Sequence, residues 1–324
     1  MSRTWVDAFT TDEIRELREV SNLRGALGIA GTWSMVAAAM VAVAVAPPLL
    51  WPLVVPLALF VIGGRQLGMA ILMHEAAHRT LFRSRRWNDR CANWLAAYPV
   101  YASVELYRPY HLQHHARTGT DEDPDIGLAR GWPVSRASMR RKVVRDLTGV
   151  TGGKRLVAQT RFLLALARGK PLGRSNALSF VGSGSAADAR AQLGGTVLWQ
   201  LGLIAVCAAA GHPLLYLLWV GAWLTTYSLC MRIRSIAEHA LTGDPGDPLT
   251  NTRTVLASPW ERMFLAPHRV NYHLEHHLLM TVPCHNLPRL HDLLAQRGLL
   301  DGACLANGYR EVLAAMVNAP AEPR

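Results

Sequence analysis

Cysteine is scarce in this chain, and its five cysteines are not spaced as a cross-linked scaffold requires. Their number is odd, no two of them form a CxxC pair, and Cys207 and Cys230 fall inside apolar runs. Disulfide frameworks and cysteine-ligated metal sites depend on even counts or on close pairs. The sequence therefore argues against both classes of protein.

Charged residues are nearly absent from four long apolar runs, although Lys, Arg, Asp and Glu make up 18% of the chain. About 20 apolar residues in a helix are enough to cross the hydrocarbon layer of a membrane. The runs match this length and are predicted to be spans: Leu27–Pro47, Leu50–Met73, Leu193–Ala210 and Pro213–Met231. The alternative is a set of buried core helices in a soluble protein, which the run lengths disfavour.

Acidic residues are fewer than basic ones, and the formal net charge is +11. The chain shows neither a base-reading fold nor a pattern of stacking aromatics, so no nucleic acid partner is expected. Most of the 34 Lys and Arg residues lie between Arg79 and Arg190, and the turns Pro47–Trp51 and Gly211–Pro213 contain none. Positively charged loops stay in the cytoplasm, so both termini and the middle segment are expected there. The basic surface would then face membrane lipid headgroups.

A signal peptide and an interdomain linker are also missing. The first 20 residues are charged and amphipathic, without an apolar h-region or a small-residue cleavage site, and they predict a surface helix. The Gly/Ser stretch Val181–Ser185 is interpreted as a loop before the third span. We expect one all-α membrane domain over residues 1–324, with four transmembrane helices in two hairpins.

Histidine, in contrast, is concentrated in places. Eight of the 13 histidines fall in three short motifs, here called boxes. Positions i, i+3 and i+4 share one face of a helix, so each box is expected to aim its imidazoles at one point. Three boxes supply more ligands than one four-coordinate zinc needs, which indicates two metal ions held by a cytoplasmic helical cap. The boxes are HEAAH (His74, His78), HLQHH (His111, His114, His115) and HLEHH (His273, His276, His277).

A ninth histidine, His239, follows the fourth span at the same membrane face and is a further candidate ligand. Glu75, Glu238 and Glu275 each neighbour a candidate ligand and could orient an imidazole by hydrogen bonding. The alternative for each carboxylate is a solvated or salt-bridged side chain.

HEAAH also matches HExxH, the motif of zinc metalloproteases, in which two histidines bind zinc and the glutamate acts as a base. A membrane-bound zinc metalloprotease is therefore the alternative from a different class. Such a site needs only three protein ligands, so a protease would not account for the two HxxHH boxes.

The complete set of motifs resembles the integral-membrane fatty acid desaturase superfamily, which also contains hydroxylases. The three boxes stand in the same order around two pairs of spans. HLQHHARTGTDEDPDI and NYHLEHHLLMTVPCHNLPRLH resemble the second and third boxes of these enzymes with the segments that follow them. The resemblance extends from about Ile29 to Leu294.

This resemblance implies a non-haem di-iron centre with two iron ions, which activates O2 and removes hydrogen from an unactivated C–H bond. It implies all eight box histidines as ligands, and His239 matches an additional ligand of the acyl-CoA desaturases. Ser235 stands where those enzymes carry an Asn linked to iron through water, so acyl-CoA specificity does not carry over directly. The expected activity is O2-dependent desaturation of an acyl chain of a fatty acid or lipid. The alternative is a hydroxylase or other oxygenase acting on another apolar or small metabolite.

The sequence contains no HPGG haem motif and no CxxC iron–sulfur pattern for an internal electron donor. The resemblance therefore implies a separate donor, namely a ferredoxin, a rubredoxin or a cytochrome b5-type protein with its reductase. The expected location is an integral membrane protein with a cytoplasmic metal site, in a bacterial inner membrane.

Overall fold

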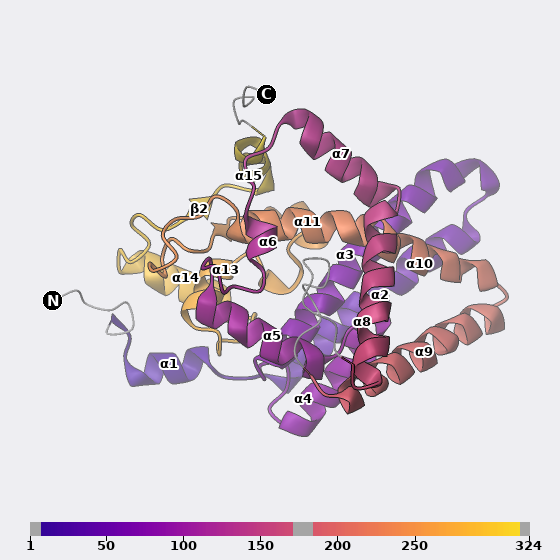
Figure 1. Cartoon of the computed structure of the whole chain (residues 1–324), viewed down its shortest axis with the longest axis horizontal. Helices are drawn as coiled ribbons and strands as arrows, with labels where there is room; N and C mark the ends of the chain where they lie inside the picture. Colours follow the sequence, from indigo (N-terminus) through magenta and orange to yellow (C-terminus); the bar gives the residue numbers. More distant parts are fainter. Residues whose placement is uncertain (1–7, 171–183, 318–324) are drawn as a thin grey trace.

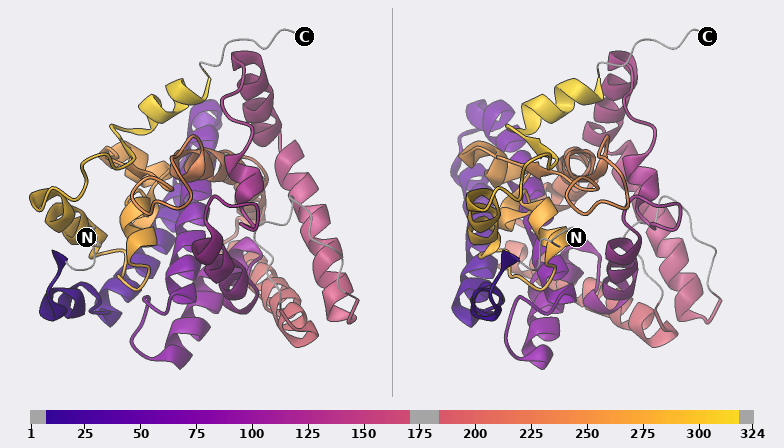
Figure 2. Two further views of the ribbon diagram at one scale, coloured as in Figure 1. Left: turned by 60° about the vertical axis from the view of Figure 1, so that its left-hand side comes forward. Right: turned by 90° about the vertical axis from the view of Figure 1, so that its left-hand side faces the viewer.

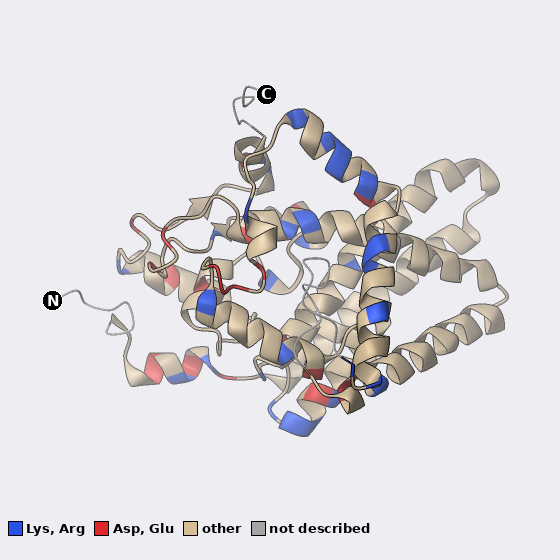
Figure 3. Ribbon diagram, in the orientation of Figure 1, with Lys and Arg blue, Asp and Glu red and all other residues tan. Residues whose placement is uncertain are grey.

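The computed structural model describes residues 8–170 and 184–317, and it is almost entirely helical (Figures 1 and 2). Four helical segments are long and apolar enough to cross a membrane, as the sequence predicts. They are α2 (Asn22–Val45), α3 (Trp51–Ala77), α9 (Ala186–Ala209), and α10 (Tyr216–Leu224) with α11 (Thr226–His239). Figure 3 shows that α2, α9 and α10 carry almost no charge over most of their length.

Shorter elements make up the rest of the described chain. The helices are α1 (Thr11–Leu17), α4 (Arg85–Ala92), α5 (Val104–Arg117), α6 (Ile126–Ala129), α7 (Arg136–Leu147), α8 (Val150–Ala167), α12 (Pro259–Phe264), α13 (His273–Leu278), α14 (Leu287–Gln296) and α15 (Tyr309–Met316). Single turns are η2 (Pro48–Leu50), η3 (Asn93–Ala97), η4 (Tyr98–Val100), η6 (Pro213–Leu215) and η7 (Pro267–Arg269). Two short parallel strands, β1 (Thr254–Val255) and β2 (Leu305–Ala306), pair with each other.

The fourth span is interrupted, whereas the sequence predicts one uninterrupted run over Pro213–Met231. The backbone leaves the helical region at Thr225 (φ −112°, ψ −87°), between α10 and α11. The Thr225 hydroxyl donates to the Gly221 carbonyl (2.6 Å), and the Thr226 hydroxyl donates to the Leu59 carbonyl of α3 (2.6 Å). Threonine hydroxyls that bond to backbone carbonyls commonly bend helices. As a result, α11 runs in a different direction from α10. It ends at His239, eight residues past Met231.

Helix α3 is the centre of the packing and contacts α2, α10, α11 and α5. It is buried continuously from Ile62 to Ala77, so its last turns run through the interior of the protein. Helix α3 packs closely against α11 at Gly63, because glycine has no side chain. A Cβ atom at Gly63 would lie 2.3 Å from Thr226 Oγ1 and 2.7 Å from the Tyr227 nitrogen.

Helix α13 is fixed by both apolar and polar contacts. Leu274 and Leu278 pack in a buried cluster with Leu17 of α1 and with the leucines of α14. In addition, the Leu274 backbone N–H donates to the Thr254 hydroxyl of β1. A six-residue helix is too short to be stable alone, so tertiary contacts must hold it in place.

Three features stay predictions from the sequence: the two-hairpin arrangement, the cytoplasmic cap and the single domain over residues 1–324. Most of the predicted loop Val181–Ser185 lies outside the described residues. The expected N-terminal surface helix is α1, and Thr10 caps it in a reciprocal capping box with Glu13.

We predict that Gly63→Val destabilises the protein by about 1–3 kcal/mol or more, because the new side chain collides with the α11 backbone. The check is the melting temperature of detergent-purified protein. Gly31→Val on α2 is the matched control, since a Cβ atom at Gly31 meets nothing within 4 Å. Equal melting temperatures for the two variants would contradict the close packing of α3 and α11.

Candidate metal centre

Four helices bring the predicted ligands together beside the buried end of α3. His74 lies in the last turn of α3, and His78 caps its C-terminus. Helix α5 carries the second box, α13 carries the third, and α11 ends at His239. All nine predicted ligands fall into two groups, and no other His, Cys, Asp or Glu joins them in the described part of the chain.

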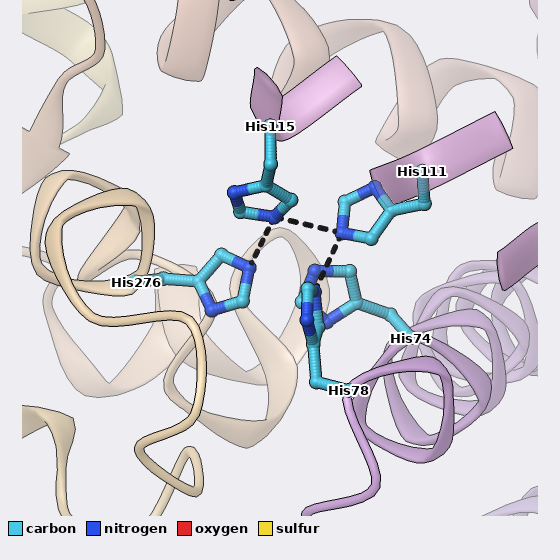
Figure 4. Close-up of side chains that lie close together, drawn as sticks. All are labelled: His74, His78, His111, His115 and His276. Atoms are coloured by element: carbon cyan, nitrogen blue, oxygen red, sulfur yellow. Dashed lines mark hydrogen bonds between the residues drawn. The ribbon is translucent and has the colours of Figure 1, made fainter. Parts of the chain in front are cut away.

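The first group, here called the five-histidine group, consists of His74, His78, His111, His115 and His276 (Figure 4). The Nε2 atoms of His78 and His111 lie 2.8 Å apart, and those of His111 and His115 lie 3.0 Å apart. The Nε2 atom of His276 lies 3.0 Å from that of His115. One ring nitrogen of every member lies within 4.8 Å of the others, so the rings surround one point.

The second group, here called the four-histidine group, consists of His114, His239, His273 and His277. The Nε2 atoms of His239 and His273 lie 2.9 Å apart. The two groups touch each other, because the rings of His115 and His277 stack with centroids 4.1 Å apart. The fold therefore places two candidate metal positions side by side.

The second and third boxes are each divided between the two groups, which corrects the expectation that each box aims at one point. In α5, His111 and His115 belong to the five-histidine group and His114 to the other. In α13, the i and i+4 residues belong to the four-histidine group and His276 crosses to the first. With about 100° per residue, positions i and i+4 diverge by only about 40°, whereas i+3 and i+4 diverge by about 100°. One HxxHH helix can therefore supply two ions.

The spacing of the nitrogens suits ligation of a shared metal ion. Imidazole nitrogens bind such an ion from about 2.1 Å, so two ligands of one ion lie about 3.0–3.4 Å apart. Four pairs of Nε2 atoms lie 2.8–3.0 Å apart, close to this separation. The Nε2 atoms of His74 and His277 are buried and have no hydrogen-bond partner in the described part of the chain. A bound ion would satisfy such atoms, each of which otherwise costs about 1–3 kcal/mol.

Burial keeps these imidazoles neutral, the form that binds metal. Burial, together with the charge of Arg108, lowers the pKa of His78 to about 3. Burial and the neighbouring imidazoles also lower the pKa of His115 and His276 well below the usual value. His114 differs. Burial is the largest single influence and lowers its pKa, but the hydrogen bond to Asp123 and the charges of Asp125 and Asp123 together outweigh burial and raise the pKa.

Asp123 is a functional candidate that the sequence analysis missed. Its Oδ1 atom accepts a hydrogen bond from His114 Nδ1 at 2.8 Å, and both side chains are buried. Asp125 Oδ2 lies 3.9 Å from the same nitrogen. A carboxylate on Nδ1 fixes the ring orientation and leaves Nε2 free to bind metal. The sequence signal for this role is the acidic DEDPD stretch at residues 121–125, separated from the second box by five residues.

The predicted supporting residues are all buried, but their roles differ. Glu75 accepts from the Thr80 hydroxyl (3.0 Å) and the Cys284 N–H (2.8 Å), and lies 3.8 Å from His74 Nδ1. Glu238 pairs with Arg234 through Oε1 (2.6 Å).

The second carboxylate oxygen of Glu238 points toward the centre. It lies 3.6 Å from His273 Nε2 and has no hydrogen-bond partner among residues 8–170 and 184–317. Glu275 holds α13, since it bonds His291 Nδ1 (2.5 Å) and the Thr254 hydroxyl and no candidate ligand. Ser235 is buried on α11, one turn before His239, and lines a pocket.

The fold and this centre define an integral membrane protein with a histidine-rich site able to hold metal. The family model for fatty acid desaturases matches residues 49–303, and the chain belongs to this family. It is therefore an oxidoreductase of the desaturase superfamily. The chain is also similar to dihydrorhizobitoxine desaturase of Bradyrhizobium elkanii, at 29% identity over 279 residues. That match covers 84% of this chain and 75% of the relative.

We predict that Asp123→Asn weakens metal binding by the four-histidine group about 10- to 100-fold, because His114 loses the charge that orients it. The five-histidine group should keep its ion. The measurement is metal per chain against chelator concentration.

Glu122→Gln is the control for this variant, since its carboxylate is exposed and pairs with Arg117 instead. Equal metal loss in both variants, or loss of both ions in Asp123→Asn, would contradict the assignment.

Proposed function

We propose that this protein is an O2-dependent oxidoreductase with a histidine-ligated di-iron centre that introduces a double bond into its substrate. The observation that carries the proposal is the pair of adjacent, buried, all-histidine groups beside the membrane-spanning helices. The nine proposed ligands are the eight box histidines and His239. Glu75, Glu238, Glu275, Ser235 and Asp123 support them.

Bound iron would supply the reduction of O2 that drives removal of hydrogen from a C–H bond. In the balanced reaction, one O2 takes two hydrogens from adjacent carbons, two electrons from a donor and two protons, and gives an alkene and two waters. The residues of this chain hold and orient the ligands and exclude water from them. Asp123 fixes His114, while the Tyr107 ring stacks on His111 with centroids 5.0 Å apart.

Two substrate classes are candidates for this reaction. The first is an acyl chain of a fatty acid or lipid, as the family and the membrane location indicate. The second is a smaller metabolite, favoured by the name of the relative, whose substrate is dihydrorhizobitoxine. The alternative reaction is hydroxylation or another oxygenation, because the same centre would also suit transfer of an oxygen atom to the substrate.

The proposal includes a separate electron donor, either a ferredoxin, a rubredoxin or a cytochrome b5-type protein with its reductase. It also places the metal centre and both termini on the cytoplasmic side of a bacterial inner membrane. The excess of Lys and Arg in the segment after α3 supports this orientation.

The zinc protease alternative is disfavoured by the position of Glu75. In an HExxH protease this glutamate is the base for the attacking water. Here Glu75 is buried, and one of its oxygens is engaged by Thr80 and Cys284. The motif also accounts for only two of the nine clustered histidines.

We expect purified protein to hold two irons per chain and to consume O2 when a donor and its substrate are present. His276→Ala should disturb the five-histidine group and His114→Ala the other, and each should abolish turnover. Elemental analysis, spectroscopy of the iron pair and O2 uptake are the measurements.

His212→Ala is the control, since His212 is exposed and lies outside both groups. Retained turnover in either ligand variant would contradict the ligand assignment. A single zinc together with failure to take up iron would overturn the proposed function.

A further inference from the structure

A pocket of about 380 Å³ lies between α6, α7, α8 and α11. Six cationic side chains line it, and no Asp or Glu is among its lining residues. Figure 3 shows basic residues along α7 and α8, on both sides of the turn that joins them. The cationic residues of the pocket are Arg130, Lys142, Arg145, Lys154, Arg155 and Arg232.

Most of this positive charge is not neutralised within the protein. Arg232 forms two bonds to the buried Asp146 (2.5 and 2.9 Å), and Arg130 pairs with Asp121. The other four cations have no carboxylate within 4 Å among residues 8–170 and 184–317. A concave surface with several uncompensated cations attracts anions and can bind carboxylate or phosphate.

Arg155 is the cation best placed to hold such an anion. Its guanidinium lies 4.3 Å from the ring centroid of Trp223 and 4.8 Å from that of Tyr227, and it donates to the Trp223 carbonyl at 3.1 Å. The close packing of α8 on α10 fixes this position. A Cβ atom at Gly152, one turn earlier in α8, would lie 2.2 Å from the Leu224 carbonyl oxygen.

The lining of the pocket comes close to chain segments that carry candidate metal ligands at two points. On α11 the pocket is lined by Ser235, one helical turn before His239. Arg155 also lines a second, inner cavity together with Met73, which directly precedes His74. This inner cavity has a volume of only about 20 Å³. That space holds about one water molecule, so an extended acyl chain does not fit in it.

We infer that the basic pocket binds the anionic group of the substrate, and that the carbons to be desaturated lie only a few bonds from this anion. The inference rests on the proposed function and narrows its substrate to a short carboxylate or phosphate ester. The anion would sit against Arg155, and the adjacent carbons would extend past Ser235 toward the histidines, because the cavity beside Met73 holds only about one water molecule.

Calorimetric titration of the iron-loaded, detergent-purified protein at low salt tests this inference. The probes are hexanoate, hexyl phosphate and the neutral hexanol, with dodecanoate as the long-chain comparison. Arg155→Gln should weaken binding of the preferred six-carbon anion about tenfold or more, since a charge-assisted hydrogen bond is lost. Arg161→Gln is the matched control, because Arg161 is exposed on α8 and does not line the pocket.

A second variant guards against a structural effect of removing Arg155 from its two aromatic neighbours. The double substitution Arg145→Gln with Lys154→Gln removes two other unpaired cations of the pocket and should also weaken anion binding. Iron content and melting temperature, measured for every variant, should stay unchanged in this double variant.

Preference for hexanoate would identify a carboxylic acid, and preference for hexyl phosphate a phosphate ester. Absence of anion binding in the unaltered protein, or equal binding in all variants, would overturn the inference. If dodecanoate binds more tightly than hexanoate and its binding depends equally on Arg155, the inference that the substrate is short would be overturned. Anion binding by a protein that takes up no iron would overturn the proposed function but leave the anion site standing.

Discussion

The burial of nine imidazoles around two neighbouring points is the constraint on which the rest of the structure depends. Ring nitrogens that approach to 2.8–3.0 Å cannot all be protonated, and several have no hydrogen-bond partner among the described residues. The cost of such an arrangement is offset when positive ions take the lone pairs. The surrounding helices hold the rings in place. Because α5 and α13 each give ligands to both groups, neither metal position can form unless both helices are docked.

The supporting contacts follow from this requirement. Helix α13 has only six residues, yet it carries three candidate ligands. Glu275 ties it to Thr254 and His291, and its leucines pack in a buried cluster. The end of α11 is directed to the centre by the break at Thr225, which separates the membrane-spanning half from the half that carries Ser235 and His239. The same course of α11 forms one wall of the basic pocket. The position of the anion site is therefore coupled to that of the four-histidine group.

Much of this was predictable from the sequence. The four apolar runs form helices long enough to cross a membrane, and the three boxes and His239 lie together. What failed was the assignment of one point to each box, since the pattern HxxHH shows a shared helix face but not the divergence between its i+3 and i+4 members. The role of Asp123 was also missed. An acidic loop is usually solvated, and only the turn after α5 brings this carboxylate back onto His114.

The sequence by itself determined the class of protein, because hydrophobic run length and histidine spacing are local properties that no packing can alter. It also identified the candidate ligands as histidines. The tertiary structure alone decided which histidine joins which group, where α10 ends and α11 begins, and how six cationic side chains come to line one pocket. These outcomes depend on contacts between residues far apart in the chain, such as Thr226 with Leu59 and Arg155 with Trp223. Such contacts have no signature in the local sequence pattern.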